Sequence, residues 1–301
     1  LALPNLNHTR VNKDSPDFCN RSNKMDSFSK KLKCTLLYPP HQSWPGSLVK
    51  PNGSLAYPMI GGALLEIGVD VRVVDATVGT ERDSLEDTFY NTTELPTGTI
   101  RTGLSDDRIL EEVADADIIG ITSIFADQES MVLHCAGIIR KAFPDKFIVS
   151  GGANARFRYE KFLNSGIDVV CLSEAEETIK KIVRRLDKGS RDFSDISSLA
   201  FLKNGQSIVN PTKPEDIIYD LDKLPMPAWH LLPNDRYWKI GRPHGGSALL
   251  GMEGELRYSS IVTSMGCPFK CSFCHIASET ADSNSGEIGK FRVKSVERVM
   301  K

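Results

Sequence analysis

The sequence predicts an α/β protein built on a doubly wound parallel sheet, and three observations lead to this fold class. Short apolar runs alternate with helix-like segments from residue 33 to about residue 188, which is the pattern of a parallel α/β sheet. Five apolar runs and five helix-like segments follow one another in strict alternation. The chain has 301 residues, 40% of them hydrophobic, and this is enough for the cores of one large or two medium-sized domains.

Each element of this sheet is predicted from its own segment. The strands are expected at residues 34–38, 70–75, 116–122, 146–151 and 168–173. The helices are expected near 55–67, 105–114, 128–142, 155–165 and 174–187. This alternation is typical of a flavodoxin-like domain, which we assign to residues 33–190, and ligands of such sheets bind outside the carboxyl ends of the strands. None of the turns there contains GxxxxGK[ST] or GxGxxG, so a larger and flatter ligand than a nucleotide is favoured.

Three further regions complete the predicted organisation. Residues 1–32 are polar and irregular, and we expect a disordered extension with the folded part starting near Met25. Residues 191–258 form a connector with a β-hairpin that turns at Asn204–Gly205 and a proline-rich strap. Residues 259–301 are expected to begin a second domain.

Three cysteines near the end of the chain are the strongest chemical signal. Cys267, Cys271 and Cys274 lie in the string CPFKCSFC. Three thiolates on one short loop can hold three irons of a cubane cluster and leave the fourth iron open for chemistry. The alternatives are a zinc site with His275 as fourth ligand and simple thiols. The other four cysteines have no framework spacing, which indicates a reduced, cytoplasmic protein.

The residues around the three cysteines resemble a sequence motif of a known enzyme family. Phe273 directly precedes the third cysteine, and the apolar run at 259–264 leads into Gly266 and Cys267. An apolar strand, a glycine and CxxxCxxC in this order resemble the cluster loop of the radical S-adenosylmethionine (SAM) enzymes.

The resemblance implies a role for each residue of the loop. Cys267, Cys271 and Cys274 would bind a 4Fe-4S cluster, SAM would chelate the open iron, and Phe273 would lie near the adenine. One electron from the cluster then breaks the sulfonium bond of SAM to give a 5′-deoxyadenosyl radical, so a donor such as flavodoxin or ferredoxin is implied. The family fold is a partial (β/α) barrel. Only 27 residues follow Cys274, so we expect only the start of that barrel and an inactive fragment.

A second resemblance concerns the sheet domain. It is similar to the cobalamin-binding domain that precedes the radical SAM domain in one subgroup, through Pro39–Pro40, Gly151–Gly152 and the acidic run 174–177. Ser123, Gly151 and Gly152 are thereby implied to contact the nucleotide tail of cobalamin, since glycine lets a backbone approach a ligand and a hydroxyl can donate to it. Such a sheet can instead hold flavin, act as a receiver or bind nothing.

The function expected from these features is a cobalamin-dependent radical SAM enzyme that transfers a methyl group to an unactivated carbon of a small molecule. The alternatives are an oxidative cyclase of the porphyrin-ester type, a radical SAM enzyme without cobalamin, and a non-catalytic flavodoxin-like module with a structural metal knuckle. A formal net charge of −2 gives no indication of nucleic-acid binding. No stretch approaches the roughly 20 apolar residues that span a bilayer.

Overall fold

The computed structural model describes residues 31–51, 55–242, 257–277 and 288–301. The expected disordered extension, residues 1–32, and the expected start of the folded part near Met25 lie outside the described residues, except for residues 31 and 32. None of the described helices is long and apolar enough to cross a membrane.

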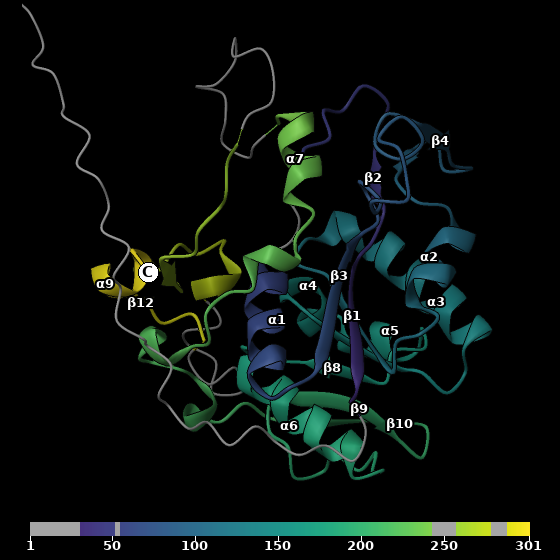
Figure 1. Ribbon diagram of the computed structural model, residues 1–301. Helices are drawn as coiled ribbons and strands as arrows, with labels where there is room; N and C mark the ends of the chain where they lie inside the picture. Colours follow the sequence, from purple (N-terminus) through teal and green to yellow (C-terminus); the bar gives the residue numbers. More distant parts are fainter. Residues whose placement is uncertain (1–30, 52–54, 243–256, 278–287) are drawn as a thin grey trace, which may run out of the picture.

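A seven-stranded sheet forms the centre of the molecule, in the order β10-β9-β8-β7-β6-β1-β3 (Figure 1). Five strands are mutually parallel, which confirms the predicted α/β class: β1 (Lys33–Tyr38), β3 (Asp70–Asp75), β6 (Ile118–Thr122), β7 (Phe147–Gly151) and β8 (Val169–Cys171). Most of their side chains are apolar and buried because helices cover both faces of the sheet. In chain order these strands lie 2-1-3-4-5, so the winding direction reverses between β1 and β6.

Helices pack on both faces of the sheet. One face carries α1 (Ala56–Glu66) and α6 (Glu176–Asp187), which share an apolar core with it. The other face carries α2 (Asp106–Val113), α3 (Glu129–Ala142), α4 (Ala153–Phe157) and α5 (Tyr159–Leu163). The single helix expected at 155–165 is therefore wrong: Arg158 has a non-helical backbone (φ −115°, ψ 22°) and separates α4 from α5.

The predicted hairpin is present and belongs to the main sheet. Its strands are β9 (Leu199–Lys203) and β10 (Gln206–Asn210), and β9 pairs antiparallel with β8. Asn204 and Gly205 have φ values of 54° and 77°, as a two-residue hairpin turn of this hand requires. The sheet thus continues past residue 190, the predicted end of the domain. A small second sheet, at the carboxyl ends of the parallel strands, contains β2 (His41–Ser43), β5 (Ile100–Thr102) and β4 (Thr92–Glu94).

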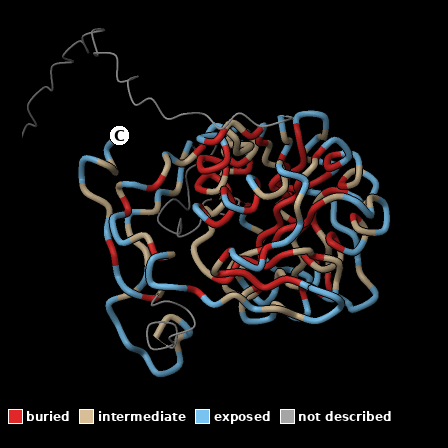
Figure 2. The backbone as a smooth tube through the Cα atoms, turned by 90° about the horizontal axis from the view of Figure 1, so that it is seen from below, coloured by how far each residue is buried: buried red, intermediate tan, exposed pale blue. Residues whose placement is uncertain are grey.

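A strap and a C-terminal segment lie beside α1 (Figure 1). The proline-rich strap is bonded to the N-terminal turn of α1 by Ala228 N–H, which donates to Pro58 O at 2.7 Å. After the strap come α7 (Asn234–Ile240), the antiparallel pair β11 (Ser264–Met265) and β12 (Arg292–Val293), and α9 (Val296–Val299). Figure 2 shows that buried residues concentrate around the sheet and are sparse in the C-terminal segment.

Candidate functional site

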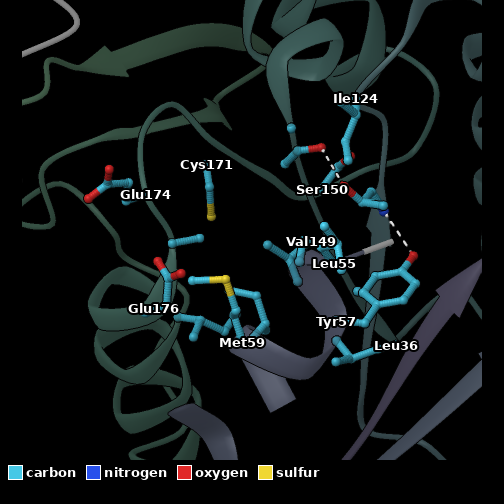
Figure 3. Close-up of a pocket in the computed structure, with 18 of the residues that line it drawn as sticks. Leu36, Leu55, Tyr57, Met59, Ile124, Val149, Ser150, Cys171, Glu174 and Glu176 are labelled. Carbon is cyan, nitrogen blue, oxygen red and sulfur yellow. Dashed lines mark hydrogen bonds between the residues drawn. The ribbon is translucent and has the colours of Figure 1, made fainter. Parts of the chain in front are cut away.

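A cavity of about 320 Å³ opens at the carboxyl ends of the parallel strands, between the sheet and helices α1 and α6 (Figure 3). Strands β6, β7 and β8 supply one wall and α1 supplies another. Most of the lining side chains are apolar, among them Leu36, Leu55, Met59, Ile60, Val149 and Ile179. The carboxyl edge of an open α/β sheet is where such folds bind their ligands, in pockets that are mostly apolar.

The structure separates the three residues predicted to contact a cofactor tail. Gly151 and Gly152 line the cavity, whereas Ser123 does not. The Ser123 side chain is fully buried, and its Oγ accepts a hydrogen bond from Asn154 Nδ2 at 3.0 Å. Thr122 and Ile124 line the cavity instead, as expected where successive side chains of extended backbone alternate between two sides.

Gly152 is required by the protein backbone itself. Its φ is +98°, and a Cβ at this position would lie 2.4 Å from the carbonyl oxygen of Ser123. Any other residue would be strained there whatever the cavity holds. The glycine therefore brings the turns after β6 and β7 together at the pocket rim.

Tyr57 fixes the wall formed by α1. Its hydroxyl donates to Leu37 O and accepts from Thr122 N–H at 3.2 Å. Burial raises the pKa of this phenol well above its ordinary value, so it stays a neutral donor. Helix α1 is thus bonded to the carboxyl ends of both β1 and β6.

The cavity contains a buried carboxyl group, Glu176, at the first position of α6. Only 5% of this residue is exposed, and it lies beside Met59 (Figure 3). Burial raises its pKa from 4.5 to about 7, and the neighbouring charges of Glu174 and Glu177 act in the same direction. The positive charge of Arg292 opposes them. Sequence reasoning noted this acidic run as a family feature and missed that Glu174 and Glu176 line the cavity.

The C-terminal segment closes the cavity and is attached by a buried ion pair. Val262 and Met265 contribute to the lining. Arg292 forms a bidentate pair with Glu174, in which Nη1 donates to Oε2 at 3.0 Å, and Nη1 also donates to Ile218 O at 2.8 Å. The two side chains are 4% and 9% exposed. The pocket is therefore complete only when this segment is in place.

The cysteine loop starts at the edge of the same pocket. Cys267 follows Met265 by two residues, and its N–H donates to Gly289 O at 3.0 Å. Gly266 between them has φ +73°, and a Cβ there would lie 2.2 Å from Lys290 O. Only glycine fits this position, so the chain enters the loop in a fixed direction.

The thiols of the loop are accessible, but they are not gathered around one point. Cys271 is exposed, Cys267 and Cys274 are half-buried, and the described cysteines are all free. No group of three metal-binding side chains is assembled within the described residues. The donor set fits an iron–sulfur cluster, since three free thiols lie on one short loop. Assembly of a cluster requires the loop to rearrange.

The two aromatic residues beside the third cysteine differ in their surroundings. Phe273 is 90% exposed. The His275 ring lies edge-on against Phe157 with 6.2 Å between ring centroids, so it packs beside α4. Neither the cluster nor the zinc site with His275 is preassembled in this part of the chain.

Comparison with known proteins identifies relatives, although no protein-family model matches the chain. An uncharacterized methyltransferase of Pyrococcus horikoshii is 32% identical over 207 residues, covering 66% of this chain and 39% of the relative. The cytidylyl-2-hydroxyethylphosphonate methyltransferase of Streptomyces wedmorensis is 25% identical over 266 residues, covering 80% and 47%. The anaerobic magnesium-protoporphyrin IX monomethyl ester cyclase of Synechocystis is 26% identical over 249 residues, covering 81% and 42%. The chain spans less than half the length of these relatives.

Solved structures share the fold. The cobalamin-dependent SAM radical enzyme OxsB, with aqua-cobalamin bound, superimposes with a TM-score of 0.58 at 18% identity, over 89% of this chain and 30% of that one. The radical SAM methyltransferase TsrM from Kitasatospora setae, with cobalamin and a [4Fe-4S] cluster bound, gives 0.57 at 14% identity, over 90% and 46%. The chain is related to the cobalamin-binding radical SAM proteins.

The two candidate sites of this chain adjoin one another. The pocket at the sheet edge and the cysteine loop share Met265 as a boundary, since this residue lines the first and stands two positions before the second. A ligand that fills the pocket and extends from its mouth would lie next to the loop.

Proposed function

We propose that this chain forms the cobalamin-binding and cluster-binding part of a radical SAM enzyme. The observation that carries the proposal is the closure of an apolar pocket, at the carboxyl ends of parallel strands, by the segment that leads directly into Cys267, Cys271 and Cys274. The relatives named above are methyltransferases and cyclases of the same class.

Several features support cobalamin as the ligand of the pocket. The strand order 2-1-3-4-5 is the flavodoxin-like order, with its ligand crevice at the point where the winding reverses. The apolar cavity suits the flat base of a nucleotide tail, with Gly151 and Gly152 at its rim and Thr122 in place of Ser123. Three aromatic residues are exposed in nearby segments of the chain: Trp44 after β2, Phe125 after β6 and Phe157 at the end of α4. A large macrocycle would cover such apolar surface.

The cysteine loop supplies the ligands of the cluster. The thiolates of Cys267, Cys271 and Cys274 would bind three irons, and Phe273 beside them is free to pack against the adenine of SAM. When bound, the cluster and SAM supply the radical, and cobalamin supplies the methyl group. Arg292 and Gly266 hold the start of the loop at the pocket rim. An electron donor such as flavodoxin or ferredoxin would reduce the cluster.

The reaction that we favour is methyl transfer to an unactivated carbon of a small molecule. An oxidative cyclisation is the second candidate, because the magnesium-protoporphyrin IX monomethyl ester cyclase of Synechocystis aligns over 81% of this chain. The two reactions would use the same pocket and the same loop.

Anaerobic reconstitution tests the proposal. The protein is incubated with iron, sulfide and methylcobalamin, desalted, and assayed for iron, acid-labile sulfide and cobalt. We expect both cofactors on the wild type. The variant Cys271→Ala should lose most of the iron and sulfide and keep the cobalt, whereas Ser272→Ala, in the same exposed stretch, should keep both.

Two results would refute the assignment. Zinc without sulfide on the wild type would indicate a structural knuckle. Absence of cobalt from the wild type would remove cobalamin from the proposal and leave the cluster.

A further inference from the structure

Most polar side chains that line the pocket already have partners within the protein. Four of them are engaged in hydrogen bonds or an ion pair: Tyr57 with Leu37, Thr122 with Gly151, Ser150 with Ile121, and Glu174 with Arg292. Each of these groups holds the pocket walls together. They are therefore not available as the principal contacts for a ligand.

Two other polar residues that line the pocket, Ser173 and Glu176, are not used in this way to hold its walls together. Ser173 Oγ is buried and has no hydrogen-bond partner among the described residues. The Glu176 carboxyl is buried, and the hydrogen bond that bears on its pKa comes from its own backbone N–H. A buried polar group without a partner is destabilising, so an occupant that bonds to Ser173 Oγ would recover that cost.

The charges around Glu176 show which form of the carboxyl this end of the pocket presents. Glu177 on α6 and Glu174 in the turn before this helix raise its pKa, and Arg292 of the C-terminal segment lowers it. Lys294 of the same segment also interacts with Glu176. On α1, Glu66 is paired with Lys180. With a pKa of about 7, the carboxyl carries its proton in a large fraction of molecules at neutral pH and can donate a hydrogen bond.

The chemistry that fits this end of the pocket is a planar aromatic ring with an acceptor nitrogen. Apolar walls contact the ring faces, while a protonated carboxyl donates to the nitrogen and the serine hydroxyl bonds to the ring edge. Resting on the function proposed above, we infer that Glu176 and Ser173 recognise a ring nitrogen of the base that ends the nucleotide tail of cobalamin. They thereby select cobamides whose lower base is a nitrogen heterocycle.

The test compares two ligands that differ in this nitrogen. Methylcobalamin carries a benzimidazole base, and a methylcobamide with p-cresol as its lower base has no ring nitrogen. Equilibrium dialysis of the full chain at pH 6.5 measures both dissociation constants. We expect the wild type to bind methylcobalamin about tenfold more tightly, since one buried hydrogen bond corresponds to roughly that factor.

The variants separate recognition from general effects on the pocket. Glu176→Leu should weaken methylcobalamin binding about tenfold and leave the p-cresol cobamide unchanged, and Ser173→Ala should reduce the preference about threefold. Glu160→Leu is the control, because Glu160 is exposed and lies on α5, on the opposite face of the sheet. It should change neither constant.

A pH series provides a readout that a purely structural role would not change. As pH rises from 6 to 8.5 the Glu176 carboxyl loses its proton, so the wild-type preference for methylcobalamin should decline. Glu176→Gln donates an amide N–H at every pH and should keep a constant preference. If circular dichroism shows that Glu176→Leu is unfolded, the pH dependence of Glu176→Gln still tests the role of Glu176.

The outcomes distinguish this inference from the proposed function. If the wild type binds neither cobamide, the cobalamin assignment is wrong and the inference is lost with it. If it binds both with equal affinity, or if its preference does not change with pH, cobalamin binding stands and the role of Glu176 is wrong.

Discussion

The sheet and the cysteine segment are stabilised in different ways. Strands β1, β6 and β7 are buried between two apolar cores. In the described residues from 257 onward no hydrophobic side chain is buried, and the buried polar residue is Arg292. The sheet therefore has its own hydrophobic core, whereas the cysteine segment depends on contacts with the sheet. The pocket is built where the two meet, so its integrity depends on the weaker part.

The largest expected difference between the regions comes from matched isoleucine truncations. Ile119 on β6 is fully buried and Ile261 is 59% exposed. Ile119→Ala should lower the free energy of unfolding by about 4 kcal/mol through lost burial and a cavity, and Ile261→Ala by less than about 0.5 kcal/mol. Urea denaturation followed by circular dichroism measures both. Similar losses at the two positions would show that the segment has a core of its own.

Removal of the ion pair should release the segment from the sheet. Arg292→Leu leaves the buried Glu174 carboxylate without its partner, which costs about 3 kcal/mol. We expect faster hydrogen exchange in residues 288–301 and faster alkylation of Cys267, with little change in the strands. The double variant Glu174→Leu with Arg292→Leu should recover part of the loss, because no charge is then left unpaired. Unchanged exchange in Arg292→Leu would show that other contacts hold the segment.

The buried carboxyl makes the stability of the pocket depend on pH. The folded protein holds the Glu176 proton up to a pH of about 7, and the unfolded chain releases it near 4.5. The folded state binds more protons in this window, so the contribution of Glu176 to the unfolding free energy falls as pH rises through it. Replacement by Gln should remove this contribution. The difference between Glu176→Gln and wild type should then grow by about 3 kcal/mol from pH 4.5 to pH 8, measured by urea denaturation; a constant difference would contradict it.

The smallest expected effect concerns the entry to the cysteine loop. Gly266→Ala places a methyl group against Lys290 O at a positive φ, at a cost of about 1–2 kcal/mol to that loop conformation. Iron incorporation on reconstitution should fall about tenfold while global stability changes little. Gly205→Ala is the control, since it also has a positive φ and no atom within 4 Å. It should lower stability by about 1 kcal/mol and leave iron binding unchanged; equal iron binding by both variants would show that the contact with Lys290 is unimportant.

Several features of the fold could be predicted because they depend on neighbouring residues. The five apolar runs became β1, β3, β6, β7 and β8 within a few residues. The hairpin turn at Asn204–Gly205 follows from the backbone preferences of those two residues. The roles of Cys267, Cys271, Cys274 and Phe273 stay predictions, because their spacing is read from the sequence and no cluster is assembled among the described residues.

Features that depend on distant contacts were missed. The resemblance pointed to Ser123, and the sequence alone does not show that its side chain lies outside the cavity while those of Thr122 and Ile124 line it. The break at Arg158 interrupts an otherwise helix-like run. Pairing of β9 with β8 brought the predicted connector into the main sheet.

The sequence by itself determined the parallel sheet and the set of thiol donors, because periodic apolar runs and short cysteine spacings act over a few residues. Only the tertiary structure decided that Arg292 pairs with Glu174 across 118 residues and that Glu176 faces the cavity. Such contacts arise when the chain packs, since burial and charge pairing depend on which distant segments become neighbours.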